Sequence, residues 1–162
     1  MRILPVLIFL VIFGGGMMPP SSAADEPLEL AEYLRLFDYQ ERQRMKTGSV
    51  QLLDLLMDGK AVLVDIRFAE EQKSWGMGFG LGIPLSELPD RLAELPRDKI
   101  IVTACPLKDR AIIAMVYLRS QGFEARYLTD GFLGLAEKLR GDNARLFMEL
   151  LPKEDGAENA KE

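Results

Sequence analysis

The chain has 162 residues, of which 48% are hydrophobic and 28% charged, the ordinary composition of one globular domain. The formal net charge is −5, and the sequence has no long basic run. Nucleic acid requires a basic surface, so we expect no nucleic-acid partner. One cysteine and no histidine exclude an internal disulfide, a Cys–His dyad and a histidine-containing zinc site, and we predict neither a metal nor a cofactor.

The first 24 residues have the regions of a signal peptide. Arg2 supplies the positive charge, Ile3 to Phe13 is an apolar run, and Ser22-Ala23-Ala24 fits the cleavage pattern. The run is about half of the roughly 20 residues that a membrane-spanning helix needs. We predict export, to the periplasm in a Gram-negative bacterium and otherwise by secretion, with no stable membrane insertion after cleavage before Asp25. An uncleaved anchor is the alternative, if Gly14 to Met18 extend the span.

Two helical patterns follow this segment. Residues 28–46 carry apolar side chains at positions 30, 33, 34 and 37, a spacing that predicts a packing helix, with a docking surface as the alternative. Ser49 is suited to cap a short helix that ends at Met57. Asp58-Gly59 is expected to stop that helix, because glycine accepts a left-handed cap.

Three short apolar runs predict buried strands, at Ala61 to Ile66, Ile100 to Ala104 and Ala125 to Thr129. Helices are predicted after the second and third strands, from Arg110 to Gln121 and from Phe132 to Leu139. The first of these helices is expected to bury Ile112, Ile113, Val116 and Leu118. Strands that alternate with helices of this length indicate an α/β domain with a parallel sheet covered by helices.

The remaining segments are predicted to be loops and short helices. Residues 74–82 contain four glycines that alternate with apolar residues, which cannot form a stable helix. We predict a loop that permits close backbone approach, and the alternative, a phosphate-binding loop, lacks the following Lys-Ser or Lys-Thr. Ser86 to Leu95 resembles a short helix broken or started at Pro89, and Asn143 can cap a last helix that ends at Leu151.

Cys105 lies between the strand that ends at Ala104 and the helix that begins near Arg110. Sites in open α/β sheets form where loops leave the carboxyl ends of the strands. The N–H groups of this turn and the helix N-terminus would stabilise a thiolate and hold an anion bound to it. Lys108 and Arg110 add positive charge. We predict that Cys105 is a reactive nucleophile, and the alternative is a buried structural cysteine.

The loop from Cys105 to Ala111, C-P-L-K-D-R-A, resembles the active-site loop of the rhodanese-like superfamily, in which an arginine follows the cysteine by five positions. Asp65-Ile66-Arg67 matches the D-V-R at the end of an upstream strand in that family. Glu71 and Pro84 fall in matching register, and residues 128–132 (L-T-D-G-F) echo the late strand and turn. The resemblance implies a three-layer α/β fold, with a central, mostly parallel sheet and helices on both faces.

The resemblance covers roughly residues 48–141, which we predict to be the rhodanese-like domain. The flanking segments are predicted to be a signal peptide (1–24), an N-terminal helical extension (25–47), a C-terminal helix (142–152) and a disordered polar tail (153–162).

The resemblance further implies sulfur transfer. The Cys105 thiolate would attack the outer sulfur of a small anionic donor, of the thiosulfate or persulfide type, and become a persulfide. It would then pass this sulfur to a thiol or cyanide-like acceptor. Six residues from cysteine through arginine resemble the sulfurtransferases of this fold, whereas the related phosphatases have one more. The implied activity is therefore that of a thiosulfate-type sulfurtransferase.

The resemblance also assigns roles to individual residues. Cys105 is the catalytic residue, and Asp65 and Arg67 are expected to support the loop structurally. The residues expected to bind the donor are Arg110, Lys108, Pro106, Leu107 and Asp109. Two of them depart from the family pattern, because Lys108 stands where a glycine is usual and Pro106 has no backbone N–H.

Two other functions stay open. A non-catalytic module with the rhodanese fold would bind a partner protein through the helix at 28–46, or through the Gly-rich loop with Trp75 and Phe79. A thiol or persulfide redox sensor would use Cys105 together with a dedicated partner.

Overall fold

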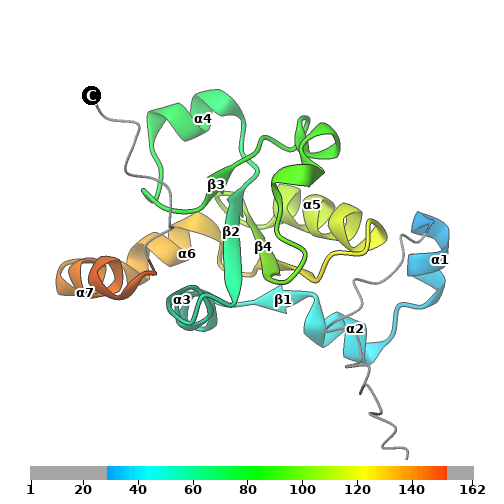
Figure 1. The fold of residues 1–162 in the computed structure, drawn as a ribbon, viewed down its shortest axis with the longest axis horizontal. Coiled ribbons are helices and arrows are strands. Elements are labelled where there is room, and N and C mark those ends of the chain that lie inside the picture. Colours follow the sequence, from blue (N-terminus) through cyan, green and yellow to red (C-terminus); the bar gives the residue numbers. More distant parts are fainter. Residues whose placement is uncertain (1–28, 153–162) are drawn as a thin grey trace, which may run out of the picture.

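A computed structural model describes residues 29–152 (Figure 1). The predicted signal peptide, the polar tail at 153–162 and Leu28 of the predicted first helix lie outside the described residues, so those expectations stay predictions. Within residues 29–152, none of the helices has the length and apolar character needed to cross a membrane.

Five parallel strands form the sheet, in the order β1-β5-β4-β2-β3. Their bounds are Lys46–Thr47 (β1), Ala61–Asp65 (β2), Leu81–Gly82 (β3), Ile100–Ala104 (β4) and Ala125–Leu128 (β5). The three central strands, β5, β4 and β2, are the three that the apolar runs predict. The edge strands β1 and β3 have two residues each, too few for a periodic pattern in the sequence.

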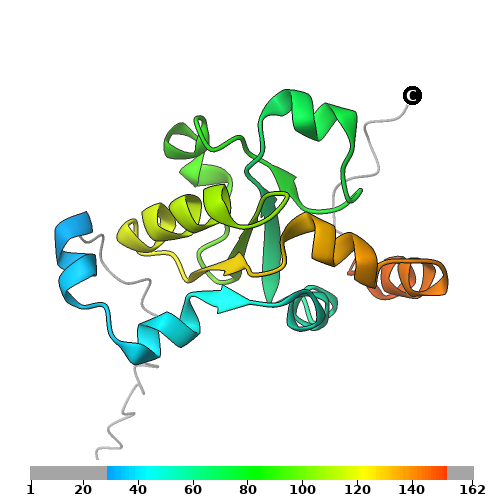
Figure 2. The same ribbon diagram turned by 180° about the vertical axis from the view of Figure 1, so that it is seen from behind.

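Helices cover both faces of this sheet (Figures 1 and 2). Their bounds are Leu30–Arg35 (α1), Tyr39–Arg44 (α2), Ser49–Met57 (α3), Ala69–Ser74 (α4), Asp109–Ser120 (α5), Gly131–Lys138 (α6) and Asp142–Leu150 (α7). One hydrophobic cluster lies between the sheet and α5, and a second lies between the sheet and α3, α6 and α7. The three-layer α/β fold with a parallel sheet is therefore confirmed.

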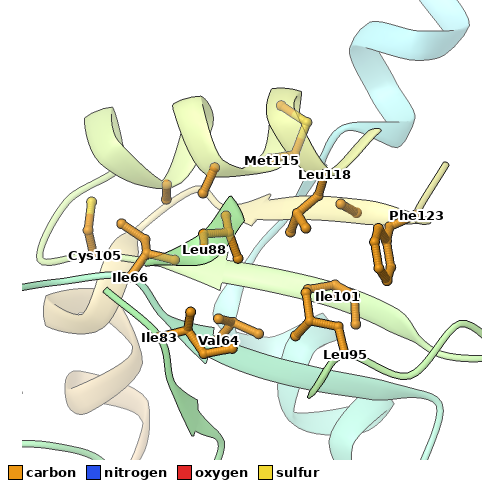
Figure 3. Packing of buried hydrophobic residues seen from close by; sticks show 13 residues of the cluster. Val64, Ile66, Ile83, Leu88, Leu95, Ile101, Cys105, Met115, Leu118 and Phe123 are labelled. Carbon is orange, nitrogen blue, oxygen red and sulfur yellow. The ribbon is translucent and has the colours of Figure 1, made fainter. Parts of the chain in front are cut away.

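The cluster under α5 extends along the whole length of that helix. Figure 3 shows Val64 and Ile101 on the sheet facing Met115 and Leu118 on the helix, with Cys105 at the loop end of the cluster. All five side chains are fully buried. Removing such a side chain from water contributes roughly 1.5–3 kcal/mol to stability. The start of α5 is thus fixed over the end of β4.

The buried face of α5 differs from the predicted one. Its buried residues are Ala111, Ala114, Met115, Leu118 and Ser120, whereas Ile113 is 59% exposed. The spacing of the buried apolar residues is the i, i+3, i+4, i+7 stripe of a helix on a flat surface. Small alanine side chains at two of these positions let α5 approach the sheet closely. Of the four side chains predicted to be buried, only Leu118 is fully so, and Ile112 and Val116 are partly exposed.

The predicted helix at 28–46 is two short helices, α1 and α2, at the opposite end of the domain from α7 (Figure 1). Asp38 separates them, because its side chain accepts a hydrogen bond from the Glu41 N–H at 2.7 Å and caps α2. The buried Glu41 carboxylate accepts the Tyr33 hydroxyl and the Arg119 guanidinium, both at 2.7 Å. This network holds α1 and α2 against α5.

Two predicted caps are wrong. Ser49 is the first residue of α3 rather than its cap, and its backbone N–H donates to the Asp130 side chain at 3.1 Å. A backbone N–H group at the start of α3 is thus hydrogen-bonded to a carboxylate 81 positions further along the chain. Asn143 lies inside α7, and its side-chain amide donates to the Lys138 carbonyl at 3.3 Å.

The Gly-rich segment is a loop that leads from α4 into β3. Trp75 packs edge-on against Phe132, and Phe79 packs against Phe147, with ring centroids 6.0 and 4.9 Å apart. Both aromatic side chains of the loop therefore pack against aromatic side chains of the C-terminal helices α6 and α7. The predicted helix at 86–95 is instead two turns of 3-10 helix, η1 (Leu88–Asp90) and η2 (Leu92–Glu94).

Candidate active site at Cys105

The segments that carry the predicted site residues leave the sheet side by side. β2 and β4 pair in register from Ala61 opposite Ile100 to Asp65 opposite Ala104. The ladder continues past the strands, because the Ile66 N–H donates to the Ala104 carbonyl at 3.1 Å. Cys105 and Arg67 therefore both lie at the carboxyl edge of the sheet, where sites in such folds form.

The Cys105 thiol is enclosed at the start of α5. Its side chain has no exposed surface, and Sγ lies 3.5 Å from Asp109 Oδ1, so that the S–H donates to this carboxylate. Leu107 is 62% exposed, and Lys108 and Asp109 are exposed as well. A thiol without exposed surface reacts only when the groups around it move, so a donor must displace part of the loop at 106–109.

The outer side of the loop is fixed by the first turn of α6. The Phe132 N–H donates to the Cys105 carbonyl at 2.9 Å, and the Leu133 N–H donates to the Pro106 carbonyl at 3.3 Å. Gly131 makes this approach possible, because a Cβ there would lie under 3.0 Å from three carbonyl oxygens of the loop. The N-terminal amides of α6 thus hold the loop by its backbone. The L-T-D-G-F segment marked this turn in the sequence, but its contact with Cys105 was not predicted.

Arg110 is engaged by a carboxylate from α4. Its Nη2 lies 3.0 Å from Glu71 Oε1, and Nη1 bonds to Glu71 Oε2, which makes a bidentate ion pair. The guanidinium also lies over the Phe68 ring, 5.3 Å from its centroid. The ion pair lowers the pKa of Glu71 and raises that of Arg110. Sequence reasoning placed Glu71 in register with the family but did not predict this partner.

Asp65, which is partly exposed, and Arg67, which is buried, form an ion pair beside the loop. The fully buried Arg67 bonds to Asp65 through Nη2 at 2.7 Å and Nε at 2.9 Å, and Nη2 also donates to the Trp75 carbonyl at 2.8 Å. The guanidinium lies between the rings of Trp75 and Phe132, 4.0 and 4.9 Å from their centroids. Because the Phe132 N–H holds the Cys105 carbonyl, this pair packs directly behind the loop.

No family model matches the chain. A stretch of 77 residues is 39% identical to an HTH-type transcriptional regulator of Mycobacterium tuberculosis, and the match covers 46% of this chain and 34% of that protein. The chain therefore spans about a third of the length of this curated relative.

Solved structures match the domain itself. The Bacillus anthracis protein CoADR-RHD is 30% identical, with a TM-score of 0.52, over 58% of this chain and 17% of that one. A rhodanese-like domain protein from Staphylococcus aureus is 23% identical, with a TM-score of 0.52, over 56% of this chain and 89% of that one. The human single-domain sulfurtransferase TSTD1 is 26% identical, with a TM-score of 0.53, over 58% of this chain and 96% of that one. The chain carries a rhodanese-like domain.

The loop of this rhodanese-like domain carries one carboxylate, Asp109, and two cations, Lys108 and Arg110. The N–H of Arg110 and the Cys105 thiol lower the pKa of Asp109, so its carboxylate stays ionised at the first turn of α5. Lys108 has a negative φ of −159°, outside the left-handed region that favours glycine, so this position does not require a glycine for a positive φ. Of the two cations, Arg110 is paired with Glu71, and the Lys108 side chain is exposed to solvent.

The rhodanese-like domain shows no candidate metal centre. Among residues 29–152, no three His, Cys, Asp or Glu side chains are grouped so as to bind a metal ion.

Proposed function

We propose that this rhodanese-like domain is a sulfurtransferase that carries a sulfane sulfur on Cys105 as a persulfide. The observation that carries the proposal is the position of Cys105 at the end of β4, in the loop that opens α5. That loop has six residues from Cys105 through Arg110, as the resemblance to sulfurtransferases requires. The similarity to the human single-domain sulfurtransferase supports the same activity.

The reaction has two displacement steps. The Cys105 thiolate attacks the outer sulfur of the donor, a new S–S bond forms, and the donor's own S–S bond breaks. Its electron pair stays with the leaving group, which is sulfite if the donor is thiosulfate. An acceptor thiol or cyanide then attacks the persulfide in the same way. The positive end of the twelve-residue helix α5 stabilises the negative charge on the loop in both steps.

A Cys105→Ser variant is expected to lose sulfur transfer down to the background rate, because no other residue of the chain is a cysteine. Intact-protein mass spectrometry after treatment with thiosulfate or cysteine persulfide should show one added sulfur on the wild type only. Reductant should remove this sulfur, and cyanide should convert it to thiocyanate. Reversal is decisive, because irreversible oxidation to the sulfinic acid adds a similar mass. No reversible adduct with any sulfane-sulfur donor contradicts the proposal.

We also propose that the protein is exported, from the signal-peptide pattern of its first 24 residues. Expressed with its own N-terminus in a Gram-negative host, it is expected in the periplasmic fraction with Asp25 as its first residue. A Leu10→Arg variant, with a charge in the apolar run, should stay in the cytoplasm uncleaved. Terminal sequencing of the two fractions checks this. Wild-type protein that stays cytoplasmic with its first 24 residues contradicts export.

A further inference from the structure

The positive end of α5 already faces an anion that belongs to the chain. Asp109 is the first residue of this helix, and its carboxylate accepts the Cys105 S–H at 3.5 Å. The N–H of Arg110, also in the first turn, lowers the pKa of Asp109. These are the groups that would otherwise bind the charge of a donor or of a persulfide on Cys105. Asp109 thus lies where an anion is expected.

Arg110, the arginine of the loop, is likewise bound to a carboxylate of the chain, that of Glu71. Both terminal nitrogens of Arg110 bond to Glu71, in an arrangement that matches the planar fork of the guanidinium to both carboxylate oxygens. Glu71 is itself held in place, because its Oε2 also accepts the Phe68 N–H at 3.2 Å at the start of α4. An anion can use Arg110 only by displacing this carboxylate.

We propose that Asp109 and Glu71 occupy the anion-binding groups of the Cys105 loop, so that the site takes its sulfur from a persulfide rather than from thiosulfate. This inference rests on the proposed sulfur transfer at Cys105. Thiosulfate carries two negative charges, and two like charges at close range repel strongly in a partly buried site. A persulfide group carries one negative charge at most, and none when it is protonated, so it delivers the same sulfur with less repulsion and without displacing Glu71.

The transfer balances without an oxidant or a reductant. The Cys105 sulfur attacks the outer sulfur of R–S–SH, which forms the Cys105 S–S bond and breaks the S–S bond of the donor. The carrier sulfur leaves as R–S⁻ with the electron pair of the broken bond. The proton of the Cys105 S–H, which is hydrogen-bonded to the ionised Asp109 in the resting site, ends on this leaving group, which departs as a thiol.

The first experiment compares two donors, thiosulfate and cysteine persulfide, by the rate of sulfur addition to Cys105. The wild type is expected to react faster with the persulfide. Asp109→Asn and Glu71→Gln should each raise the thiosulfate rate at least about tenfold, which corresponds to about 1.4 kcal/mol of activation free energy, and change the persulfide rate much less. A wild type that prefers thiosulfate, or variants with an unchanged preference, would overturn the inference.

Two matched controls separate this effect from a general change in charge. Asp142→Asn removes the same charge from the first turn of α7, and Glu70→Gln removes it from α4 beside Glu71. Among the described residues, the side-chain hydrogen bonds and ion pair of Cys105 and Arg110 go to Asp109 and Glu71 and not to these two carboxylates. Both controls are expected to keep the wild-type preference. If the controls raised the rate of sulfur addition from thiosulfate as much as Asp109→Asn does, the inference would be overturned.

A second measurement needs no sulfur transfer. Iodoacetate and iodoacetamide alkylate the same thiol, but only iodoacetate is an anion, so their rate ratio reports the charge around Cys105. Asp109→Asn should raise the iodoacetate to iodoacetamide ratio, and Asp142→Asn should not. An unchanged ratio overturns the role given to Asp109, even if a persulfide forms. A raised ratio without a persulfide from either donor overturns the sulfurtransferase function, and the choice of donor with it.

Discussion

A Gly131→Ala variant is expected to lose more than about 3 kcal/mol of unfolding free energy, because two penalties coincide at this residue. Gly131 has a φ of +60°, in the left-handed region that costs an alanine about 1–2 kcal/mol. An added Cβ would also lie under 3.0 Å from the carbonyl oxygens of Cys105, Pro106 and Leu107. These are backbone atoms, so the loop and α6 must separate to admit it.

Gly78→Ala is the control. Gly78 also has a positive φ, of +76°, but nothing lies within 4 Å of a Cβ built there, so this variant should show a backbone penalty alone. Urea denaturation of the two variants and the wild type measures both losses of stability. Equal losses in the two variants would mean that the contact between α6 and the Cys105 loop contributes nothing. A larger loss in Gly131→Ala, together with slower sulfur transfer, is the expected result.

The central strands were predictable from sequence because each is a continuous apolar run, as burial on both faces demands. Cys105 was located for the same reason, since it follows the run at Ile100–Ala104 directly. The edge strands β1 and β3 were not predictable. A strand of two residues has no pattern of its own, and it exists only because β5 or β2 offers a free edge to pair with.

The predicted buried face of α5 is wrong because it follows the hydrophobicity of single residues, whereas burial follows the phase of the helix. Ile113 is the more hydrophobic side chain, but Ala114 and Met115 lie on the stripe that faces the sheet. The partners of the charged loop residues were beyond prediction for another reason. Glu71 and Arg110 are 39 positions apart, and only the packing of α4 beside the loop brings them together. Asp109 was predicted to bind the donor, not to accept the Cys105 thiol.

Asp65→Asn is expected to lower the unfolding free energy by about 3 kcal/mol, the lower end of the cost of removing one partner from a buried ion pair, because the Asp65 side chain is 17% exposed. Arg67 has no exposed surface, and Asp65 is the carboxylate that faces it, at 2.7 Å. An asparagine can still accept a hydrogen bond, but it leaves the guanidinium charge without a counter-charge in a site of low dielectric. The loss should therefore exceed that of the hydrogen bonds alone.

Asp58→Asn is the control that tests whether burial of the ion pair causes the loss of stability. Asp58 pairs with Lys60 at the same 2.7 Å, but both side chains are more than half exposed, and such surface pairs contribute at most about 1 kcal/mol. A double variant, Asp65→Asn with Arg67→Met, removes the unpaired charge as well and should recover part of the loss. Because Arg67 packs on Phe132, whose N–H holds the Cys105 carbonyl, Asp65→Asn should also slow sulfur transfer. Equal destabilisation by Asp65→Asn and Asp58→Asn would show that burial adds nothing to the Asp65–Arg67 pair.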